Sequence, residues 1–379
     1  MRLLSLELRN FRNHRNARAE LDGEPSLLLG ENGSGKTNWI EAAVLLSIGR
    51  SFRGARDREL VARGAERFEV RGAVVSRAGV RSEIVARGSR NGPREVEVDG
   101  AALPRLAELL GRFPTAHFSV EDVAILNGAP AGRRRFLDVA LCQLEPAYVG
   151  HLRDYNAALK QRNRLLVEAG PVEASADDEL GAWEMILARS GAELDRRRED
   201  LTAELNRILG ELSRDLDSEL EAGIDYTAAV TEPGESGVAK RAERLERHRG
   251  RDRRLGWTAE GPHRAPVACR AAGRDLVEGA SRGMTRLYSI LLRLALARVL
   301  DARLEEPPVV FLDDPESELD PRWIGRLLRI VPETSQVVLT ACRALTATPA
   351  MYRRFAMESL ASAASGGGAM TATPARAEA

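Results

Sequence analysis

The stretch Leu27-Leu28-Leu29-Gly30-Glu31-Asn32-Gly33-Ser34-Gly35-Lys36-Thr37 decides the fold of this chain. It contains the pattern G-x-x-x-x-G-K-[ST], placed between an apolar run that predicts a buried strand and residues 39–46, which predict a helix. A glycine-rich turn in that position directs backbone N–H groups and a helix N-terminus at one point, which creates an anion site. The pattern predicts a nucleotide phosphate site made of Gly30, Glu31, Asn32, Gly33, Ser34, Gly35, Lys36 and Thr37.

Lysine is rare in this chain, which argues against a chance match to the pattern. Only Lys36, Lys160 and Lys240 occur, against a large excess of arginine. Lys36 is placed to reach the β- and γ-phosphates of a nucleotide, and Thr37 to offer its hydroxyl to Mg²⁺. The alternative is a glycine-rich turn with an incidental lysine.

A second signal lies at residues 309–314, where four apolar residues precede Asp313 and Asp314. The pattern predicts a buried strand that ends in two acids at the edge of a sheet. Mg²⁺ takes hard oxygen ligands, so Asp313 and Thr37 together would hold the metal of a magnesium–nucleotide site. Asp314 is placed to polarise an attacking water, which makes it and Lys36 the candidate catalytic residues. The alternative for the acid pair is a solvated acidic turn.

Composition excludes several classes of protein. The net charge is zero, so a polyanion site would have to be a local patch, and aromatics at 4% argue against a base-stacking platform as the main binding surface. Three scattered cysteines without metal-ligand spacing indicate reduced thiols in the cytoplasm. The N-terminus alternates like a strand rather than a signal peptide, and no apolar run reaches membrane-spanning length, so no membrane partner is expected.

The order of predicted elements points to an insertion. Strands are expected at 1–8, 68–75, 83–85 and 95–98, which would add antiparallel strands to the phosphate-loop unit in one mixed sheet. Residues 134–216 predict paired helices of moderate length, with one apolar stripe of Leu194, Leu201, Leu205, Ile208, Leu212 and Leu216. A leucine-rich helix near 284–300 and a strand at 336–340 follow. Because the acid pair lies far beyond the phosphate loop, a helical block is inserted into one nucleotide-binding fold, as in ABC-type ATPases.

Further segments resemble the RecF family of bacterial repair proteins, which are ABC-type ATPases related to SMC and Rad50. The matching segments follow one another along residues 1–345: 8–13, 30–38, 49–53, 118–122, 127–130, 133–138, 155, 159–166, 252–258, 261–264 and 317–320. The resemblance implies an α/β fold with a mixed-sheet lobe at 1–117 and 300–360 and an inserted helical lobe at 118–299. A polar, small-residue tail at 361–379 predicts disorder.

The resemblance also implies site residues, binding partners and a biological role. It adds Arg12, in the first matching segment, to the ATP site, and assigns Ser281 and Gly283 to a signature that caps the ATP held at Lys36 of another subunit. The expected product is an ATP-dependent head-to-tail homodimer that closes on single-stranded or gapped DNA. The implied role is recombinational repair and replication, with RecO and RecR loading RecA, and support for the SOS response.

Three departures from the family pattern bear on hydrolysis. The signature carries Met284 where the family has glutamine, and Ala265-Pro266 follows Gly-Pro-His-Arg where two acids are usual. The strand at 336–340 leads into Thr340-Ala341-Cys342 where ABC ATPases often carry a switch histidine, a place that Thr340 would take. Asp314 is one methylene shorter than the glutamate of most ABC enzymes. We therefore predict a weak ATPase that acts as a switch.

A DNA-binding patch is the weaker inference. Residues 240–254 hold eight basic and three acidic residues, and the candidate contacts are Arg244, Arg247, Arg249, Arg251, Arg253 and Arg254. The alternative is a solvated, salt-bridged helix face. His263 would either touch nucleotide or DNA or serve as a hydrogen-bonded structural histidine. For the whole chain the rivals are the ATP motor of a membrane transporter and an ATP-binding DNA switch without useful turnover, the latter favoured by Met284.

Overall fold

A computed structural model describes residues 1–119, 128–168, 177–216, 220–315, 321–331, 334–342 and 352–357. The chain divides into two compact units. Unit 1 comprises Met1–Ala124, Ile208–Glu221 and Ala280–Ala379, and unit 2 comprises Ile125–Arg207 and Ala222–Gly279. The expected matches at 120–122, 127 and 317–320 and the predicted tail at 361–379 lie outside the described residues.

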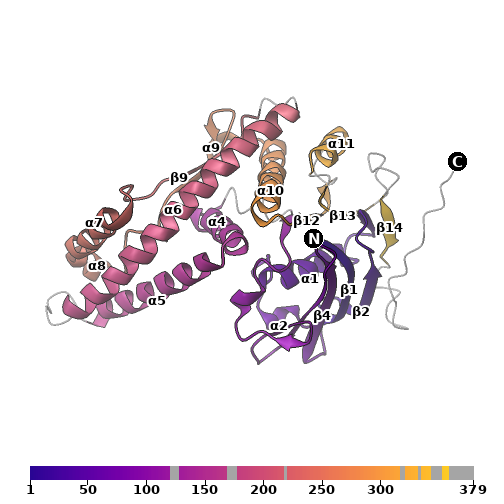
Figure 1. The fold of residues 1–379 in the computed structure, drawn as a ribbon, viewed down its shortest axis with the longest axis horizontal. Helices are drawn as coiled ribbons and strands as arrows, with labels where there is room; N and C mark the ends of the chain where they lie inside the picture. The colour runs from indigo at the N-terminus through magenta and orange to yellow at the C-terminus, as the bar shows by residue number, and fades with distance from the viewer. Residues whose placement is uncertain are drawn as a thin grey trace. The chain divides into compact units, whose positions relative to one another are not determined.

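Unit 1 holds an antiparallel sheet built from the N-terminal strands. Its order is β2-β1-β4-β5-β6-β7. The neighbouring strands β2, β1 and β4 are labelled in Figure 1. The strands are β1 (Arg2–Phe11), β2 (His14–Glu20), β4 (Arg67–Val75), β5 (Arg81–Ser89), β6 (Glu95–Val98) and β7 (Ala101–Ala102). Alternate residues of β4 are buried, which matches the polar–apolar alternation of its sequence, and β1 keeps this alternation only from Leu6 to Leu8.

A second sheet of unit 1 is parallel throughout, in the order β14-β3-β13-β12-β8. The strands are β3 (Ser26–Leu29), β8 (Thr115–Phe118), β12 (Val309–Leu312), β13 (Val337–Ala341) and β14 (Arg353–Ala356). β12 and β13 are entirely buried, as expected for strands covered on both faces. Because the strands are parallel, the carboxyl ends of β3, β12 and β13 meet at one edge. The prediction of one mixed sheet is therefore corrected to two sheets.

Helix α1 (Lys36–Ile48) explains why the sheets are separate. It contacts β1, β4 and β5 of one sheet and β8 and β13 of the other. Every residue from Trp39 to Ile48 is buried, so the helix is covered on all sides and fills the space between the sheets. Unit 1 also contains α2 (Asp57–Leu60), η1 (Leu106–Leu109), α10 (Arg282–Leu304) and α11 (Pro321–Ile330).

Unit 2 is mainly helical. Its elements are α4 (Pro130–Leu144), α5 (Pro146–Glu168), α7 (Gly234–Arg247), α8 (Arg249–Leu255), α9 (Leu276–Gly279) and a small antiparallel sheet of β9 (Gly223–Tyr226), β10 (Val267–Ala271) and β11 (Arg274–Asp275). Helix α6 (Asp177–Asp215) begins in unit 2 and its last turns belong to unit 1. Its 39 residues exceed the moderate length that we predicted.

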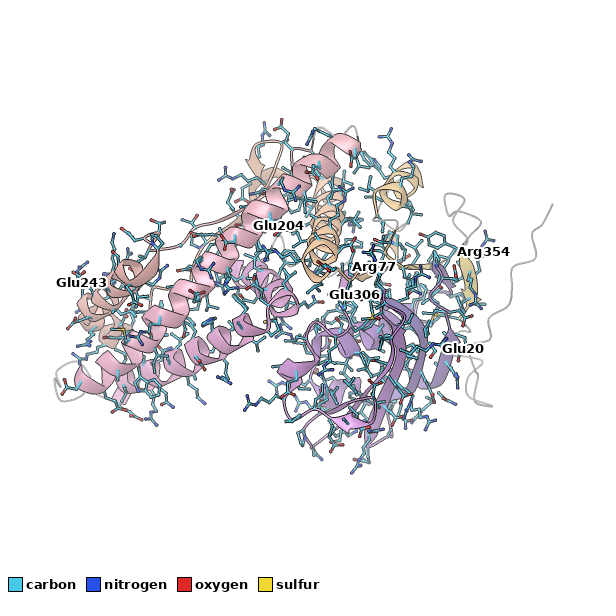
Figure 2. All side chains as sticks on the ribbon, viewed as in Figure 1. Glu20, Arg77, Glu204, Glu243, Glu306 and Arg354 are labelled. Carbon is cyan, nitrogen blue, oxygen red and sulfur yellow. The ribbon has the colours of Figure 1, made fainter. Side chains whose placement is uncertain are left out.

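The apolar stripe from Leu194 to Leu216, which lies on α6 except for Leu216, is buried in the core. None of its six residues is more than 3% exposed. The helical segment 280–299, which we placed in the helical lobe, groups instead with unit 1, because α10 packs against β8. Charged side chains such as Glu243 on α7 point outward (Figure 2). Within the described residues no helix is both long and apolar enough to cross a bilayer.

Candidate nucleotide site

The phosphate loop joins β3 to α1 in the conformation that its glycines allow. Gly33 and Gly35 have φ angles of 84° and 104°, in the left-handed region that residues with a Cβ rarely adopt. A Cβ on Gly35 would also lie 2.5 Å from Nε2 of His14. The N–H of Gly30 donates to the carbonyl of Ala341 at 3.2 Å, which ties the start of the loop to β13. The loop is thus preformed, with the first turn of α1 facing the recess.

Lys36 is held inside this loop. Its side chain is 6% exposed, and Nζ donates to the carbonyls of Gly30 at 2.5 Å and Glu31 at 3.1 Å. Phosphate oxygens are stronger acceptors for an ammonium group than these carbonyls. The lysine therefore stands ready to bind an anion in a recess of about 350 Å³, a volume within the range of small-ligand pockets.

The two halves of the predicted metal site meet. Thr37 Oγ1 donates to Asp313 Oδ2 at 2.6 Å, although 276 positions separate the residues. Both oxygens are hard donors, which suits Mg²⁺, and one hydroxyl with one carboxylate leaves the remaining positions to phosphate and water. The residues thus fit the metal. Among the described residues no group of three or more His, Cys, Asp or Glu side chains forms a separate all-protein metal site.

Thr340 fixes both acids. Its hydroxyl donates to Asp313 Oδ1 at 2.7 Å and accepts from the N–H of Asp314 at 2.9 Å, and its side chain is 0% exposed. Asp313 therefore uses one oxygen for Thr340 and turns the other toward Thr37. Thr340 is a buried support for the acids. The side chain at the end of the strand that borders the loop is Cys342, 3.0 Å from Asn32 Oδ1 and 3.6 Å from Lys36 Nζ.

Asp314, the candidate base, lines the same recess as Lys36 and Thr37. Its φ of 48° is unusual for a residue with a side chain and places the carboxylate beside Cys342, 3.9 Å from Sγ. Strain of this kind is often stored at functional sites, and here the Thr340 hydroxyl holds the backbone in place.

The turn between β1 and β2 supplies residues that the sequence analysis missed. Asn13 Nδ2 donates to the carbonyl of Ser34 at 3.2 Å, and His14 Nε2 lies 3.1 Å from the carbonyl of Gly35. Burial lowers the pKa of His14, so the ring is neutral and must carry its proton on Nε2 to donate to that carbonyl. Asn38 donates to Asn13 at 2.8 Å. These bonds hold the carbonyls of Ser34 and Gly35 in place. The phosphate-loop pattern does not predict them, because Asn13 and His14 lie outside it.

Arg12 is engaged next to the recess and does not line it in the described structure. It forms a bidentate pair with the fully buried Glu41, at 2.8 and 2.7 Å, and donates to the carbonyl of Glu59 at 3.1 Å. Glu41 also accepts a hydrogen bond from Ser51 at 2.5 Å. Contact between Arg12 and a nucleotide therefore remains a prediction, and it would compete with this pair.

Ser281 and Gly283 lie at the start of α10, and neither lines the recess around Lys36. Ser281 is the N-cap, exposed, and its Oγ accepts from the N–H of Met284 at 3.2 Å. The structure brings together the phosphate loop, Asp313 and Asp314. It leaves the signature as a separate, exposed helix N-terminus.

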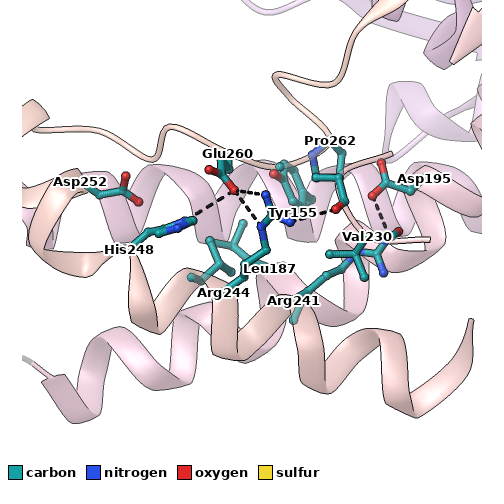
Figure 3. Close-up of a pocket in the computed structure, with 14 residues that line it drawn as sticks. Tyr155, Leu187, Asp195, Val230, Arg241, Arg244, His248, Asp252, Glu260 and Pro262 are labelled. Atoms are coloured by element: carbon teal, nitrogen blue, oxygen red, sulfur yellow. Dashed lines mark hydrogen bonds and ion pairs between the residues drawn. The ribbon is translucent and has the colours of Figure 1, made fainter. Parts of the chain in front are cut away.

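Most of the predicted DNA contacts are engaged by carboxylates of unit 2. Arg244 and Arg251 pair with Glu260 at 2.8 and 3.0 Å, and Arg249, 13% exposed, pairs with the buried Glu184 at 2.6 Å. Figure 3 shows Arg244 and His248 facing Glu260 in a pocket of this unit. For these residues the pairing favours the salt-bridged alternative.

The other three candidate arginines are those at positions 247, 253 and 254. Arg247 pairs with the exposed Glu243, one turn away on α7, and Arg253 is half-buried. Arg254 is exposed at the end of α8. A phosphate contact from this segment stays a prediction, and Arg247 and Arg254 are the two arginines best placed to make it.

His263 is a structural histidine. Its Nε2 lies 3.0 Å from the carbonyl of Thr258, which can only accept, so Nε2 carries the proton. Nδ1 then accepts from the hydroxyl of Tyr155 at 2.7 Å. Burial, aided by nearby arginines, lowers the pKa of His263 to about 4, so the neutral form is the one present. With both nitrogens used, the ring has no position left for a ligand.

The fold and the site define an ABC-type ATPase head. Residues 2–359 match the model of the RecF/RecN/SMC N terminal domain. A crystal structure of an Smc head bound to the winged-helix domain of ScpA shares the fold at 15% identity, with a TM-score of 0.53 and 94% of each chain covered.

Proteins with higher sequence identity to this chain identify the family within this class of ATPases. The DNA replication and repair protein RecF of Symbiobacterium thermophilum is 36% identical over 347 residues, covering 90% of this chain and 91% of that protein. RecF of Synechococcus sp. strain JA-2-3B'a(2-13) is 34% identical over 346 residues with the same coverage. The structure of the recombination mediator RecF with ATP has a TM-score of 0.86 at 31% identity, covering 94% of this chain and 95% of that one. The chain belongs to the RecF family, which confirms the predicted resemblance and fold class.

Proposed function

We propose that this chain is an ATP-dependent DNA-binding protein of recombinational repair and replication. ATP with Mg²⁺ binds at the phosphate loop, drives head-to-tail dimerisation, and closes the dimer on single-stranded or gapped DNA. By family, its partners are RecR and RecO, and its outputs are RecA loading and support for the SOS response. No disulfide joins the cysteines at 142, 269 and 342, all of which the structure describes, and this suits the proposed cytoplasmic location.

The observation that carries the nucleotide part is the meeting of Thr37 and Asp313 at 2.6 Å beside Lys36. Two segments far apart in the sequence, the β3–α1 loop and the end of β12, supply the candidate phosphate, metal and water groups, and Thr340 of β13 holds the two acids. The structures of RecF solved with ATP and its analogue support ATP as the nucleotide.

The protein groups would act as follows during hydrolysis. The loop N–H groups and Lys36 bind and orient the phosphates, and Thr37 with Asp313 holds the Mg²⁺, which supplies charge neutralisation when bound. Asp314 accepts a hydrogen bond from the attacking water and orients it. Its side chain is shorter than glutamate, so it reaches less far, and we expect turnover to be slow.

The second candidate function is an ATP-binding DNA switch with no useful turnover. Met284 favours it, because a thioether cannot make the hydrogen bonds of an amide. The exposed N-cap Ser281 is compatible with both candidates, because it requires only that a second subunit approach.

The test compares wild type with Lys36→Ala and Met284→Gln. We expect ATP to shift wild type to a dimer in size-exclusion chromatography, Lys36→Ala to remain monomeric, and Met284→Gln to hydrolyse ATP faster. Lys36→Ala that still dimerises on ATP would refute the mechanism. Wild-type turnover at the blank rate, with ATP-dependent dimerisation and DNA binding intact, would select the switch.

A further inference from the structure

The loop at residues 256–266 of unit 2 presents an aromatic–cation pair at the surface. The guanidinium carbon of Arg264 lies 4.2 Å from the centre of the Trp257 ring. Trp257 is 37% exposed and Arg264 is exposed. A single exposed aromatic residue needs no explanation by itself. This pair, however, lies on a loop whose backbone is anchored on both sides by buried polar groups, and that arrangement calls for an explanation.

One side of the loop is anchored by buried polar groups. The N–H and the hydroxyl of Thr258, next to Trp257, donate to Asn163 Oδ1 at 2.8 and 2.7 Å. Arg162 donates to the Thr258 hydroxyl at 2.8 Å. Arg162 is 0% exposed and pairs with the buried carboxylates of Glu184 and Asp252. Buried ions are costly to desolvate, so this network serves to fix geometry more than to add stability.

The other side is anchored as firmly. Arg198 donates to the carbonyl of Pro262 at 2.8 Å, and Arg134 donates to that of Ala265 at 2.9 Å. These two carbonyls flank the segment that carries Arg264. Gly261 has a φ of 135°, and a Cβ there would lie 2.5 Å from the Tyr155 hydroxyl. The backbone on both sides of the pair is therefore held in one conformation.

The charge around Arg264 is positive. The only acid between residues 256 and 266 is Glu260, which is already paired with Arg244 and Arg251. Arg134 lies near enough to Arg264 for their charges to interact, and burial together with Arg198 and Arg264 lowers the pKa of Arg134. A rigid loop that carries the exposed guanidinium of Arg264 beside an exposed indole has the chemistry that binds phosphate and stacks on a base.

We propose that Trp257 and Arg264 form a contact for single-stranded DNA, in which the indole stacks on an unpaired base and the guanidinium binds the adjacent phosphate. The contact is local, in keeping with the low aromatic content of the chain. It rests on the proposed function, because it names where the DNA strand would touch unit 2.

The test measures binding of a fluorescein-labelled oligo(dT) and of a blunt duplex by anisotropy, with ATP, over a series of salt concentrations. The variants are Trp257→Ala, Trp257→Phe and Arg264→Gln. Arg274→Gln is the matched control, since Arg274 is an exposed arginine of β11 in the same unit. Circular dichroism and unfolding midpoints establish that each variant is folded.

We expect Trp257→Ala to weaken oligo(dT) binding about tenfold, because one stacked base contributes roughly 1–3 kcal/mol, while duplex binding is unchanged. Trp257→Phe keeps an aromatic ring and retains most of the affinity. Arg264→Gln reduces the slope of log K against log salt by about 0.7, as loss of one single-strand phosphate contact requires.

Three results would overturn the proposal. In the first, wild type binds DNA and both Trp257→Ala and Arg264→Gln bind it as Arg274→Gln does. The loop at 256–266 then does not contact DNA, and the proposed function stands without this inference. An equal loss on duplex and on oligo(dT) would contradict stacking. Wild type that binds no DNA would overturn the proposed function and this inference together.

Discussion

Replacing Thr340 by valine tests whether its hydroxyl holds the two acids of the nucleotide site. Valine keeps the shape of the side chain and removes one oxygen. Two hydrogen bonds disappear, one to the carboxylate of Asp313 and one from the N–H of Asp314. The first, to a charged group, is worth about 1.5–3 kcal/mol, and leaving the second donor buried without a partner costs about 1–3 kcal/mol. We expect Thr340→Val to lower the free energy of unfolding by about 3–5 kcal/mol.

Thr340→Ser is the matched control, because it keeps the hydroxyl and loses only a methyl group, at a cost of about 1 kcal/mol. Urea unfolding compares the two variants, and nucleotide binding and ATP turnover are measured on the folded proteins. Lys36 and the loop are untouched, so Thr340→Val should reduce turnover far more than it reduces ATP affinity.

The reasoning fails if the valine and serine variants unfold at the same urea concentration and turn over ATP at the same rate. That result would mean that Asp313 keeps its orientation through Thr37 alone. A fall in ATP affinity as large as the fall in turnover would instead assign Thr340 to binding.

Three further predictions use other parts of the two units. Gly35→Ala should abolish ATP binding, because the new Cβ would collide with the side chain of His14. Gly33→Ala has open space around it, so it should cost only backbone strain of about 1–2 kcal/mol. Isothermal titration with ATP compares the two variants. Arg12→Met should cost about 3 kcal/mol because it strands the buried carboxylate of Glu41, and the double variant with Glu41→Met should recover most of that loss; additive unfolding energies would contradict the pairing. The pKa of His263 is lowered to about 4 from 6.5, so the unfolded chain binds the extra proton, and stability should fall by about 2 kcal/mol as pH drops from about 7 to 5. His263→Gln should remove that dependence, and urea midpoints at the two pH values decide.

The phosphate loop and the acid strand could be predicted from the sequence, because each is a contiguous pattern whose residue types suit one chemical role. Their meeting followed from the metal that the two patterns would share. The sequence patterns missed strands whose residues are poor strand formers. β2 reads His-Arg-Asn-Ala-Arg-Ala-Glu and β14 reads Arg-Arg-Phe-Ala, so neither carries the β-branched run that marks a strand. Both are edge strands that pair with a stronger neighbour, and their conformation comes from that neighbour.

The two-sheet architecture was missed for a related reason. Periodicity marks a helix and a strand, but it does not say how many layers a helix touches. Eight of the ten residues from Trp39 to Ile48 are apolar, and an apolar stretch that is not confined to one helix face was the available sign of a helix between two sheets. The partners of a charged residue are equally non-local. Arg249 is paired by Glu184, and Arg244 by Glu260, so a count of charges within 240–254 could not distinguish a patch from a paired face.

In the proposed dimer, the backbone at the start of α10 would cap the nucleotide even with methionine at position 284. Ser281 already satisfies the N–H of Met284, and in a helix the first N–H groups have no partner within the helix. The backbone N–H groups at positions 282 and 283 and the Ser281 hydroxyl would therefore meet a γ-phosphate whatever side chain stands at 284, helped by the positive end of a helix that runs to Leu304. What methionine removes is an additional side-chain donor or acceptor. Loss of that group should loosen the closed dimer and slow hydrolysis while leaving its assembly possible, which is the behaviour of a switch that remains long in its ATP-bound state.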